Sequence, residues 1–316
     1  MAMKNRLILC LALAIAALAP VAAQAQGQSP AKEVRYYSEQ VQVAGKLYLP
    51  TGFSPASKVA AVVLAPGWGK TGDSLDAYGK ALAAKGLVAL AIDYRGFGKS
   101  GGLIYLVQDV AMDDRLRFSN HTPKIRIRRG RLDPQAQIQD IRNAMTFLQG
   151  QAGVDRARIG YLGIDMAGGH AVALGGMDAR IKAAVAVTPI IAGKDVPRMS
   201  YQPSAATQAE MIRLARTGAA PTGSAAGKAM NEAEAKVLLA EYRPFWWADA
   251  VPATASYLFL TAANDEVVKN ADNADAASKL IKGSEIRTLA GAKHALTAAQ
   301  TEEAAIGAAT YLAAKL

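Results

Sequence analysis

One stretch, residues 158–171, limits the folds open to this chain more than any other. It reads R-I-G-Y-L-G-I-D-M-A-G-G-H-A, a short apolar run that ends in small residues and passes directly into an Ala/Gly-rich run of helical character. The pattern predicts a strand, a sharp turn and a helix in immediate succession. Gly163 and Gly168 suit such a turn because they let backbone segments approach where a larger side chain would collide.

The turn itself, residues 163–167, follows the G-x-S-x-G pattern of a nucleophile elbow, whose central side chain projects above a sheet. Here it reads G-I-D-M-A, so Asp165 stands where serine is usual and Ala167 replaces the last glycine. No serine occurs between Ser119 and Ser200, so no serine near the elbow can take over its role. Either Asp165 carries the chemistry or the elbow has none.

Strands alternate with helices on both sides of the elbow, which predicts an α/β fold built on one doubly wound, mostly parallel sheet. An antiparallel hairpin comes first, over 34–43 and 46–50, with its turn at Ala44-Gly45. Buried strands are expected at 58–65, 87–94, 158–162, 181–187, 255–261 and 285–289, and helices at 73–85, 134–149, 271–281 and 301–316.

Residues 190–250 break this alternation and are expected to form a helical cap insertion above the carboxyl edge of the sheet, where ligands bind in such folds. Two helix-like pieces, 207–217 and 229–242, flank a loop rich in Gly, Ala, Pro and Ser. The aromatic side chains here are candidates for the substrate pocket, although they equally suit packing between cap and core. These candidates are Tyr201, Tyr242, Trp246 and Trp247.

Two residues after the last strands complete a possible catalytic set. Asp265 follows the strand at 255–261, and His294 follows the strand at 285–289. Nucleophile, acid and histidine in this chain order are typical of α/β-hydrolases, in which the acid orients the histidine and stabilises its charged form. Of the other two histidines, His170 is expected to pack or line the site, and His121 to be solvated.

The first 25 residues predict a secretory signal peptide. Lys4 and Arg6 precede an apolar run over 7–18, and A-Q-A at 23–25 is a small-x-small cleavage site. The mature chain is then 26–316, periplasmic or secreted, and the apolar run is too short for a comfortable membrane span. The only cysteine, Cys10, lies within the signal, so we expect no disulfide and no thiolate chemistry.

A basic run over 124–131 accounts for much of the positive charge. The formal net charge is +10, and removal of Lys4 and Arg6 leaves +8 because residues 1–25 contain no acid. Alternating Ile125 and Ile127 favour an edge strand with a solvated basic face, and export argues against a nucleic-acid partner.

From residue 34 to 316 the chain resembles an α/β-hydrolase of the dienelactone hydrolase and acetyl-xylan-esterase-like group. The resemblance implies the α/β-hydrolase fold, a small-molecule substrate and no cofactor. We also expect no metal site, since no metal cluster, phosphate loop or dinucleotide fingerprint is evident. The matching motifs are L-A-P-G-W-G at 64–69, D-Y-R-G-F-G-K-S at 93–100, D-P-Q at 133–135, G-I-D-M-A-G-G at 163–169, N-D at 264–265 and G-A-K-H at 291–294.

An aspartate at the elbow tip is similar to the triads of epoxide hydrolases and haloalkane dehalogenases. A carboxylate attacks an sp3 carbon well but an ester carbonyl poorly, since the latter gives an anhydride. The sequence therefore favours covalent displacement by Asp165, then hydrolysis by water that His294 activates, with the backbone N–H groups of Trp68 and Met166 as oxyanion hole.

An epoxide is favoured over a halide, because Met166 and Trp68 replace the tryptophan and asparagine with which dehalogenases hold halide. Trp68 suits the epoxide pattern, whereas Pro66 departs from its H-G-x-P motif. Two alternatives stay open. One is an ester or lactone hydrolase in which Asp165 acts as a base toward water, and the other is an inert hydrolase fold used for binding.

Overall fold

The computed structural model describes residues 31–107, 122–191, 205–217 and 241–316, together with seven single positions between 228 and 239. The expected signal peptide, as well as Tyr201 and His121, lies outside the described residues. Within them, no helix is both long enough and apolar enough to cross a bilayer.

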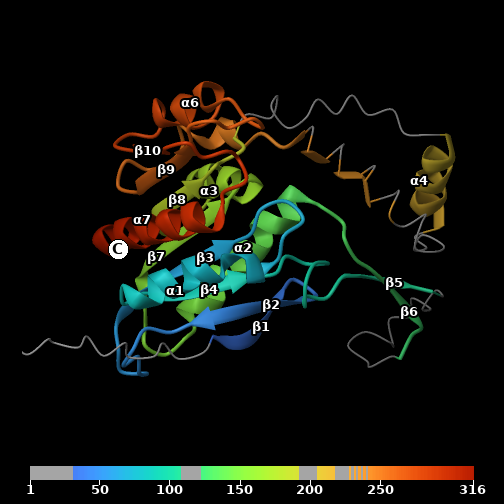
Figure 1. Ribbon diagram of the computed structural model, residues 1–316. Coiled ribbons are helices and arrows are strands. Elements are labelled where there is room, and N and C mark those ends of the chain that lie inside the picture. Colours follow the sequence, from blue (N-terminus) through green and yellow to red (C-terminus); the bar gives the residue numbers. More distant parts are fainter. Residues whose placement is uncertain are drawn as a thin grey trace, which may run out of the picture.

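An eight-stranded sheet forms the centre of the molecule, in the order β1-β2-β4-β3-β7-β8-β9-β10 (Figure 1). The six strands from β4 to β10 are parallel, while β1 and β2 run antiparallel at one edge. The strands are β1 (Lys32–Ser38), β2 (Val41–Tyr48), β3 (Val59–Ala65), β4 (Val88–Ile92), β7 (Val154–Ile164), β8 (Ile181–Val187), β9 (Ser256–Ala262) and β10 (Glu285–Leu289).

Helices cover both faces of this sheet, and each face has its own apolar core. On one side α1 (Asp76–Ala84) packs against α7 (Ala298–Lys315), and on the other α2 (Pro134–Gln149) packs against α3 (Met166–Met177). The short α6 (Ala274–Ser278) adds its buried alanines to the α2–α3 side. Three 3-10 turns complete the fold: η1 (Gly72–Leu75), η3 (Pro244–Trp247) and η4 (Asn270–Asp272).

The predicted doubly wound sheet is therefore present, and its buried parallel strands are almost wholly apolar because both faces are covered. The helix predicted at 134–149 has the same bounds in the structure, where the side chain of Asp133 caps its N-terminus. The predicted hairpin turn at Ala44-Gly45 is wrong. Both residues lie inside β2, and the chain reverses at Glu39, whose φ of +55° supplies the left-handed step that a tight turn needs.

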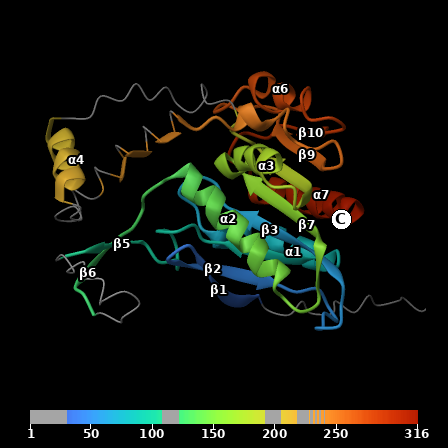
Figure 2. The ribbon, with the colours of Figure 1, turned by 180° about the vertical axis from the view of Figure 1, so that it is seen from behind.

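Two excursions leave the sheet between its strands, and both extend away on the same side of the molecule (Figures 1 and 2). The first, after β4, carries a separate two-stranded ribbon of β5 (Leu103–Leu106) and β6 (Ile125–Arg128). The second, after β8, is the expected cap segment and contains α4 (Ala205–Thr217). Both begin at carboxyl ends of parallel strands, the edge at which such folds bind ligands.

Candidate active site

The elbow holds Asp165 in a backbone conformation that a non-glycine residue rarely adopts. Its φ is +58°, between the last residue of β7 and the first residue of α3. Hydrogen bonds fix this conformation: the Asp165 N–H donates to the Val187 carbonyl at 2.9 Å, and the Asp165 carbonyl accepts from Gly168 and Ile190. Strain of this kind costs of order 1–3 kcal/mol and is typical of functional sites.

Glycines at the elbow are required by close approach. A Cβ on Gly163 would lie 2.0 Å from the Ala167 carbonyl oxygen, and one on Gly67 would lie 2.9 Å from Asp165 Oδ2. Below the turn, the Tyr161 hydroxyl donates to that same Ala167 carbonyl at 2.8 Å. The backbone path that presents Asp165 therefore leaves no room for side chains at these positions.

The structure brings Asp165, Asp265 and His294 into one hydrogen-bonded chain. His294 Nδ1 lies 2.9 Å from Asp265 Oδ2, and His294 Nε2 lies 3.2 Å from Asp165 Oδ1. The ring thus bridges the two carboxylates, as the geometry of a triad requires. The Asp265 side chain is 1% exposed and that of Asp165 is 21% exposed. The tip carboxylate is thus the accessible one.

Two loops at the carboxyl edge set the positions of Asp265 and His294. The loops after β9 and β10 pair through Ala263 N–H to the Leu289 carbonyl and Asn264 N–H to the Ala292 carbonyl. Asp265 Oδ1 also accepts the backbone N–H groups of Val267 and Val268. These bonds hold the Asp265 carboxylate, so its face toward His294 is pre-oriented.

The surroundings of His294 change its protonation. Burial alone would lower its pKa, but hydrogen bonds to Asp165 and Asp265 and the charges of both carboxylates outweigh burial and raise the pKa above its ordinary value of 6.5. A protonated ring between two carboxylates is stabilised by both. The ring can therefore hold its proton to a higher pH than a free imidazole does, and it becomes a base as the pH rises further.

The two oxygens of Asp165 differ in their partners. Oδ1 faces the imidazole, whereas Oδ2 accepts the Trp68 backbone N–H at 2.9 Å. Met166 is the first residue of α3, so its N–H has no partner within the helix. Both backbone donors expected for the oxyanion hole thus lie at the elbow, Trp68 on the loop after β3 and Met166 at the start of α3, and the Trp68 N–H already contacts the carboxylate.

The structure places Tyr242 away from the role expected for it. Its hydroxyl contacts His170 Nδ1 at 2.5 Å, and the other ring nitrogen of His170 lies 3.1 Å from Gln137 Oε1. Both rings are buried, and burial lowers the pKa of His170 to about 3. The hydroxyl of Tyr242 is engaged within the core, because a buried polar group needs a partner. Gln137 was absent from the sequence candidates, and an isolated glutamine in an amphipathic helix carries no signal that would have found it.

The two tryptophans do not lie beside Asp165 as pocket-wall residues would. Trp246 is 75% exposed, and Trp247 packs against Gly176, where its backbone oxygen lies 2.7 Å from the Cβ that any larger residue would carry. Gly176 lies near the far end of α3, about 15 Å of helix from Met166 at 1.5 Å per residue. η3 therefore runs along α3: its first residue, Pro244, lies beside Gly169 near the elbow, and Trp247 lies at the far end of the helix from Asp165.

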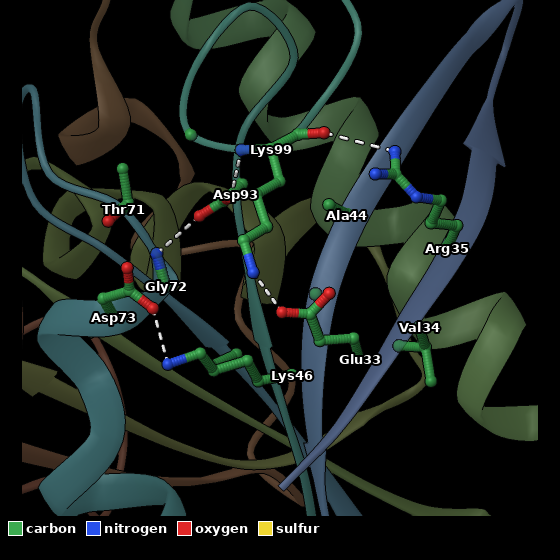
Figure 3. A pocket seen from close by; sticks show the side chains of 13 residues that line it. Glu33, Val34, Arg35, Ala44, Lys46, Thr71, Gly72, Asp73, Asp93 and Lys99 are labelled. Atoms are coloured by element: carbon green, nitrogen blue, oxygen red, sulfur yellow. Dashed lines mark hydrogen bonds and ion pairs between the residues drawn. The ribbon is translucent and has the colours of Figure 1, made fainter.

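A separate hollow of about 370 Å³ lies on the β1–β2 side of the sheet (Figure 3). Its charged groups neutralise one another: Lys46 pairs with Asp73 at 2.5 Å, and Lys99 pairs with Glu33. None of the triad residues lines it, so it takes no part in the chemistry at Asp165. Its lining includes Arg35, Ala44, Thr71, Gly72, Asp93 and Gly98.

In the described part of the chain, no group of three or more His, Cys, Asp and Glu side chains has an arrangement that could hold a metal ion.

Three known proteins show what the chain is similar to. The thiohydrolase aneE of Aspergillus aculeatus is 26% identical over 152 residues, which are 48% of this chain and 39% of that protein. The crystal structure of hypothetical protein PA2218 from Pseudomonas aeruginosa matches 98% of this chain and 100% of its own, with a TM-score of 0.68 and 16% identity. Acetyl xylan esterase 1 from Thermoanaerobacterium matches 89% of this chain and 83% of its own, with a TM-score of 0.56 and 16% identity.

The sequence relatives are matched over only part of their length, between 30% and 44%. The solved structures, at their low identities, show the fold alone. A family model described as serine aminopeptidase, S33, matches residues 56–246, more than half of the chain, and includes the elbow. The chain therefore belongs to the serine aminopeptidase S33 family and has the α/β-hydrolase fold.

Proposed function

We propose that this hydrolase cleaves a small, largely apolar electrophile by covalent displacement, with Asp165 as the nucleophile. One observation carries the proposal, namely that the two oxygens of Asp165 have different hydrogen-bond partners. Oδ1 lies 3.2 Å from His294 Nε2, while Oδ2 accepts the Trp68 N–H at 2.9 Å. A carboxylate held in this way has one oxygen for attack and one for charge stabilisation.

In the first step, a lone pair of Asp165 Oδ1 forms a bond to an sp3 carbon of the substrate. The electron pair of the broken bond leaves with the epoxide oxygen or the halide. Oδ2 becomes the carbonyl oxygen of the alkyl ester and keeps its bond from the Trp68 N–H. Attack at sp3 carbon avoids the anhydride that an ester substrate would give.

In the second step, His294 Nε2 takes a proton from water, and the water oxygen adds to the carboxyl carbon of Asp165. The negative charge collects on Oδ2, where the Trp68 and Met166 N–H groups stabilise it. Collapse breaks the bond from the carboxyl carbon to Oδ1, and the substrate leaves as an alkoxide that takes the proton from His294. The new carboxylic acid of Asp165 then loses its proton, to the alkoxide formed in the first step for an epoxide or to solvent for a halide. Asp165 is restored with one oxygen from water, and Asp265 steadies the charged His294 throughout.

Of the residues that favoured an epoxide, Tyr242 has its hydroxyl engaged elsewhere. The cap tyrosines were the acid candidates for epoxide opening, and the hydroxyl of Tyr242 is bound to His170 in the core. Trp68 still matches the aromatic residue that follows the glycine in epoxide hydrolases. Epoxides are therefore the first substrates to test, and alkyl halides the second.

The test is turnover of an epoxide and an alkyl halide in heavy-oxygen water, followed by mass spectrometry of the peptide that carries Asp165. The proposal expects label in that peptide, and it expects the His294→Gln variant to accumulate alkylated Asp165. Asp265 is an internal control, because its carboxylate is 1% exposed and should stay unlabelled. Turnover without label on Asp165 would end the covalent mechanism. Absence of turnover with every electrophile offered would instead support an inert binding role.

Ester or thioester hydrolysis is the second candidate, and the comparisons favour it. The family is named for a serine nucleophile, and one relative is named a thiohydrolase. In this mechanism Asp165 acts as a base toward water, so the product is labelled and the protein is not. The Asp165→Ser variant discriminates further: covalent displacement at sp3 carbon should be lost in it, while ester hydrolysis should persist or increase, because His294, Asp265 and the Trp68 N–H remain in place.

A further inference from the structure

The β5–β6 ribbon has two faces of different character. Ile104 pairs with Ile127 and Leu106 pairs with Ile125 across the two strands. Because side chains alternate between faces along a strand, these four residues share one face. We call it the outer face.

The inner face of the ribbon is held by the cap segment. Arg128 is 7% exposed and pairs with Glu234 at 2.8 Å, while its Nε donates to Asn231 at 2.7 Å. Asn231 in turn donates to the Arg129 carbonyl. The ribbon is therefore anchored from one side, and these bonds orient its outer face away from the cap segment.

The outer face consists of large apolar side chains in contact with solvent. Ile104 is 56% exposed, Leu106 48%, Ile125 45% and Ile127 58%. Figures 1 and 2 show the ribbon standing clear of the main sheet. An apolar surface on a projecting two-stranded ribbon is unusual, because such ribbons need a covering layer for stability and exposed apolar patches mark interaction sites.

The ribbon and the residues beside it are rich in basic side chains. Residues 103–107 and 122–131 contain five basic residues and no acidic one. Lys124 and Arg126 are exposed, and among the described residues neither has an ion-pair partner. Arg126 pairs with Tyr105 and so lies on the opposite face of the ribbon from the isoleucines, and Lys124 immediately precedes β6. Their long stems let the cations reach past the edges of the ribbon.

We propose that the outer face docks on the surface of an anionic phospholipid bilayer. Its isoleucines and leucine would enter the boundary between headgroups and acyl chains, while Lys124 and Arg126 contact lipid phosphates. A second copy of the chain suits the surface less well. Four side chains cover far less than the roughly 800 Å² per partner of a stable protein interface.

The test is co-sedimentation of the chain 26–316 with vesicles of equimolar phosphatidylcholine and phosphatidylglycerol. The proposal expects binding that weakens in high salt and is much lower on pure phosphatidylcholine. The double variant Lys124→Gln/Arg126→Gln should bind about 25-fold more weakly, at about fivefold for each cation near an anionic surface. Ile104→Ser/Ile127→Ser should lose roughly tenfold or more, because less apolar surface is buried.

Matched variants elsewhere on the surface control for charge and hydrophobicity. Lys279→Gln/Lys282→Gln removes the same charge, and Ile286→Ser/Ile306→Ser removes exposed isoleucines of the main fold. Both should bind vesicles like the parent protein. Equal losses in the control and ribbon variants, or no binding to the anionic vesicles, would overturn the proposal. A dimer detected by light scattering that Ile104→Ser/Ile127→Ser converts to monomer would also overturn it, in favour of a second copy.

Discussion

The two described histidines, His294 and His170, differ in the charge of the groups around them. His294 lies between two carboxylates at the carboxyl edge, and its pKa is raised. His170 lies one turn into the elbow helix, between a tyrosine hydroxyl and a glutamine amide, and burial lowers its pKa to about 3. Burial disfavours the charged ring in both places, so the charge of the neighbours decides which histidine can hold a proton.

The two rings therefore have different roles. His294 can change its protonation near neutral pH, which a proton-transfer group requires. His170 stays neutral over the same range and connects α2, α3 and the end of the cap segment through Gln137 and Tyr242. It is a packing and positioning residue.

The largest expected effect is the loss of turnover in His294→Gln. Removal of the proton-transfer group should lower kcat by about 10³-fold, since general acid–base catalysis contributes 10²- to 10⁴-fold. The free energy of unfolding should change much less. Steady-state kinetics and urea unfolding check both parts. A variant that keeps full turnover would remove His294 from the mechanism and leave the two histidines alike.

The second effect concerns stability. His170→Leu should lower the free energy of unfolding by about 3 kcal/mol, because the buried hydroxyl of Tyr242 and amide of Gln137 lose their partner. The double variant His170→Leu/Tyr242→Phe should recover part of this loss by removing one orphaned group. Urea unfolding of the single and double variants measures the coupling. Additive losses would show that the hydrogen bond between the two rings contributes nothing.

The dependence of stability on pH should follow the same residue. The folded pKa of His170, at about 3, lies below the ordinary 6.5, so the unfolded chain binds the proton first as the pH falls. The contribution of His170 is thus full above pH 6.5 and is lost between 6.5 and 3. His170→Leu should be less acid-sensitive than the parent over this window. Parallel urea unfolding curves at several pH values make the comparison.

The smallest effect is a shift in the titration of His294. Asp265→Asn removes one hydrogen-bonded carboxylate and should lower the pKa of His294. The base form, which the second chemical step needs, then appears at lower pH. Glu266→Gln is the control, since Glu266 is exposed and accepts the His294 backbone N–H at 3.2 Å rather than a hydrogen bond from the ring. Imidazole NMR titrations of the three proteins give the order.

The same raised pKa has a consequence for stability with the opposite sign. The interaction of charged His294 with its carboxylates stabilises the folded state fully below pH 6.5, and this contribution is lost as the pH rises through the raised folded pKa. Compared with His294→Gln, the parent protein should therefore lose stability on the alkaline side of 6.5, whereas His170 acts on the acid side. Coincident windows for the two residues would contradict the assignment.

Much of the fold and the triad followed from the sequence alone. The elbow glycines, the apolar strand runs and the chain order of Asp165, Asp265 and His294 are local signals, because each reflects a backbone or burial requirement that acts within a few residues. The parallel strands then bring residues at their carboxyl ends to one edge. For this reason the triad could be assembled without any knowledge of side-chain contacts.

Long-range partners decided the rest. Packing between segments about 70 residues apart decides whether Tyr242 faces a substrate or His170. The same packing sets how η3 lies along α3. The register of β1 with β2 was likewise set by pairing and by the strained Glu39, against the local signal of Ala44-Gly45. The charge state of each histidine is the clearest case. The sequence predicts that His170 and His294 both lie close to the site, but only the tertiary structure places carboxylates around His294 and neutral groups around His170.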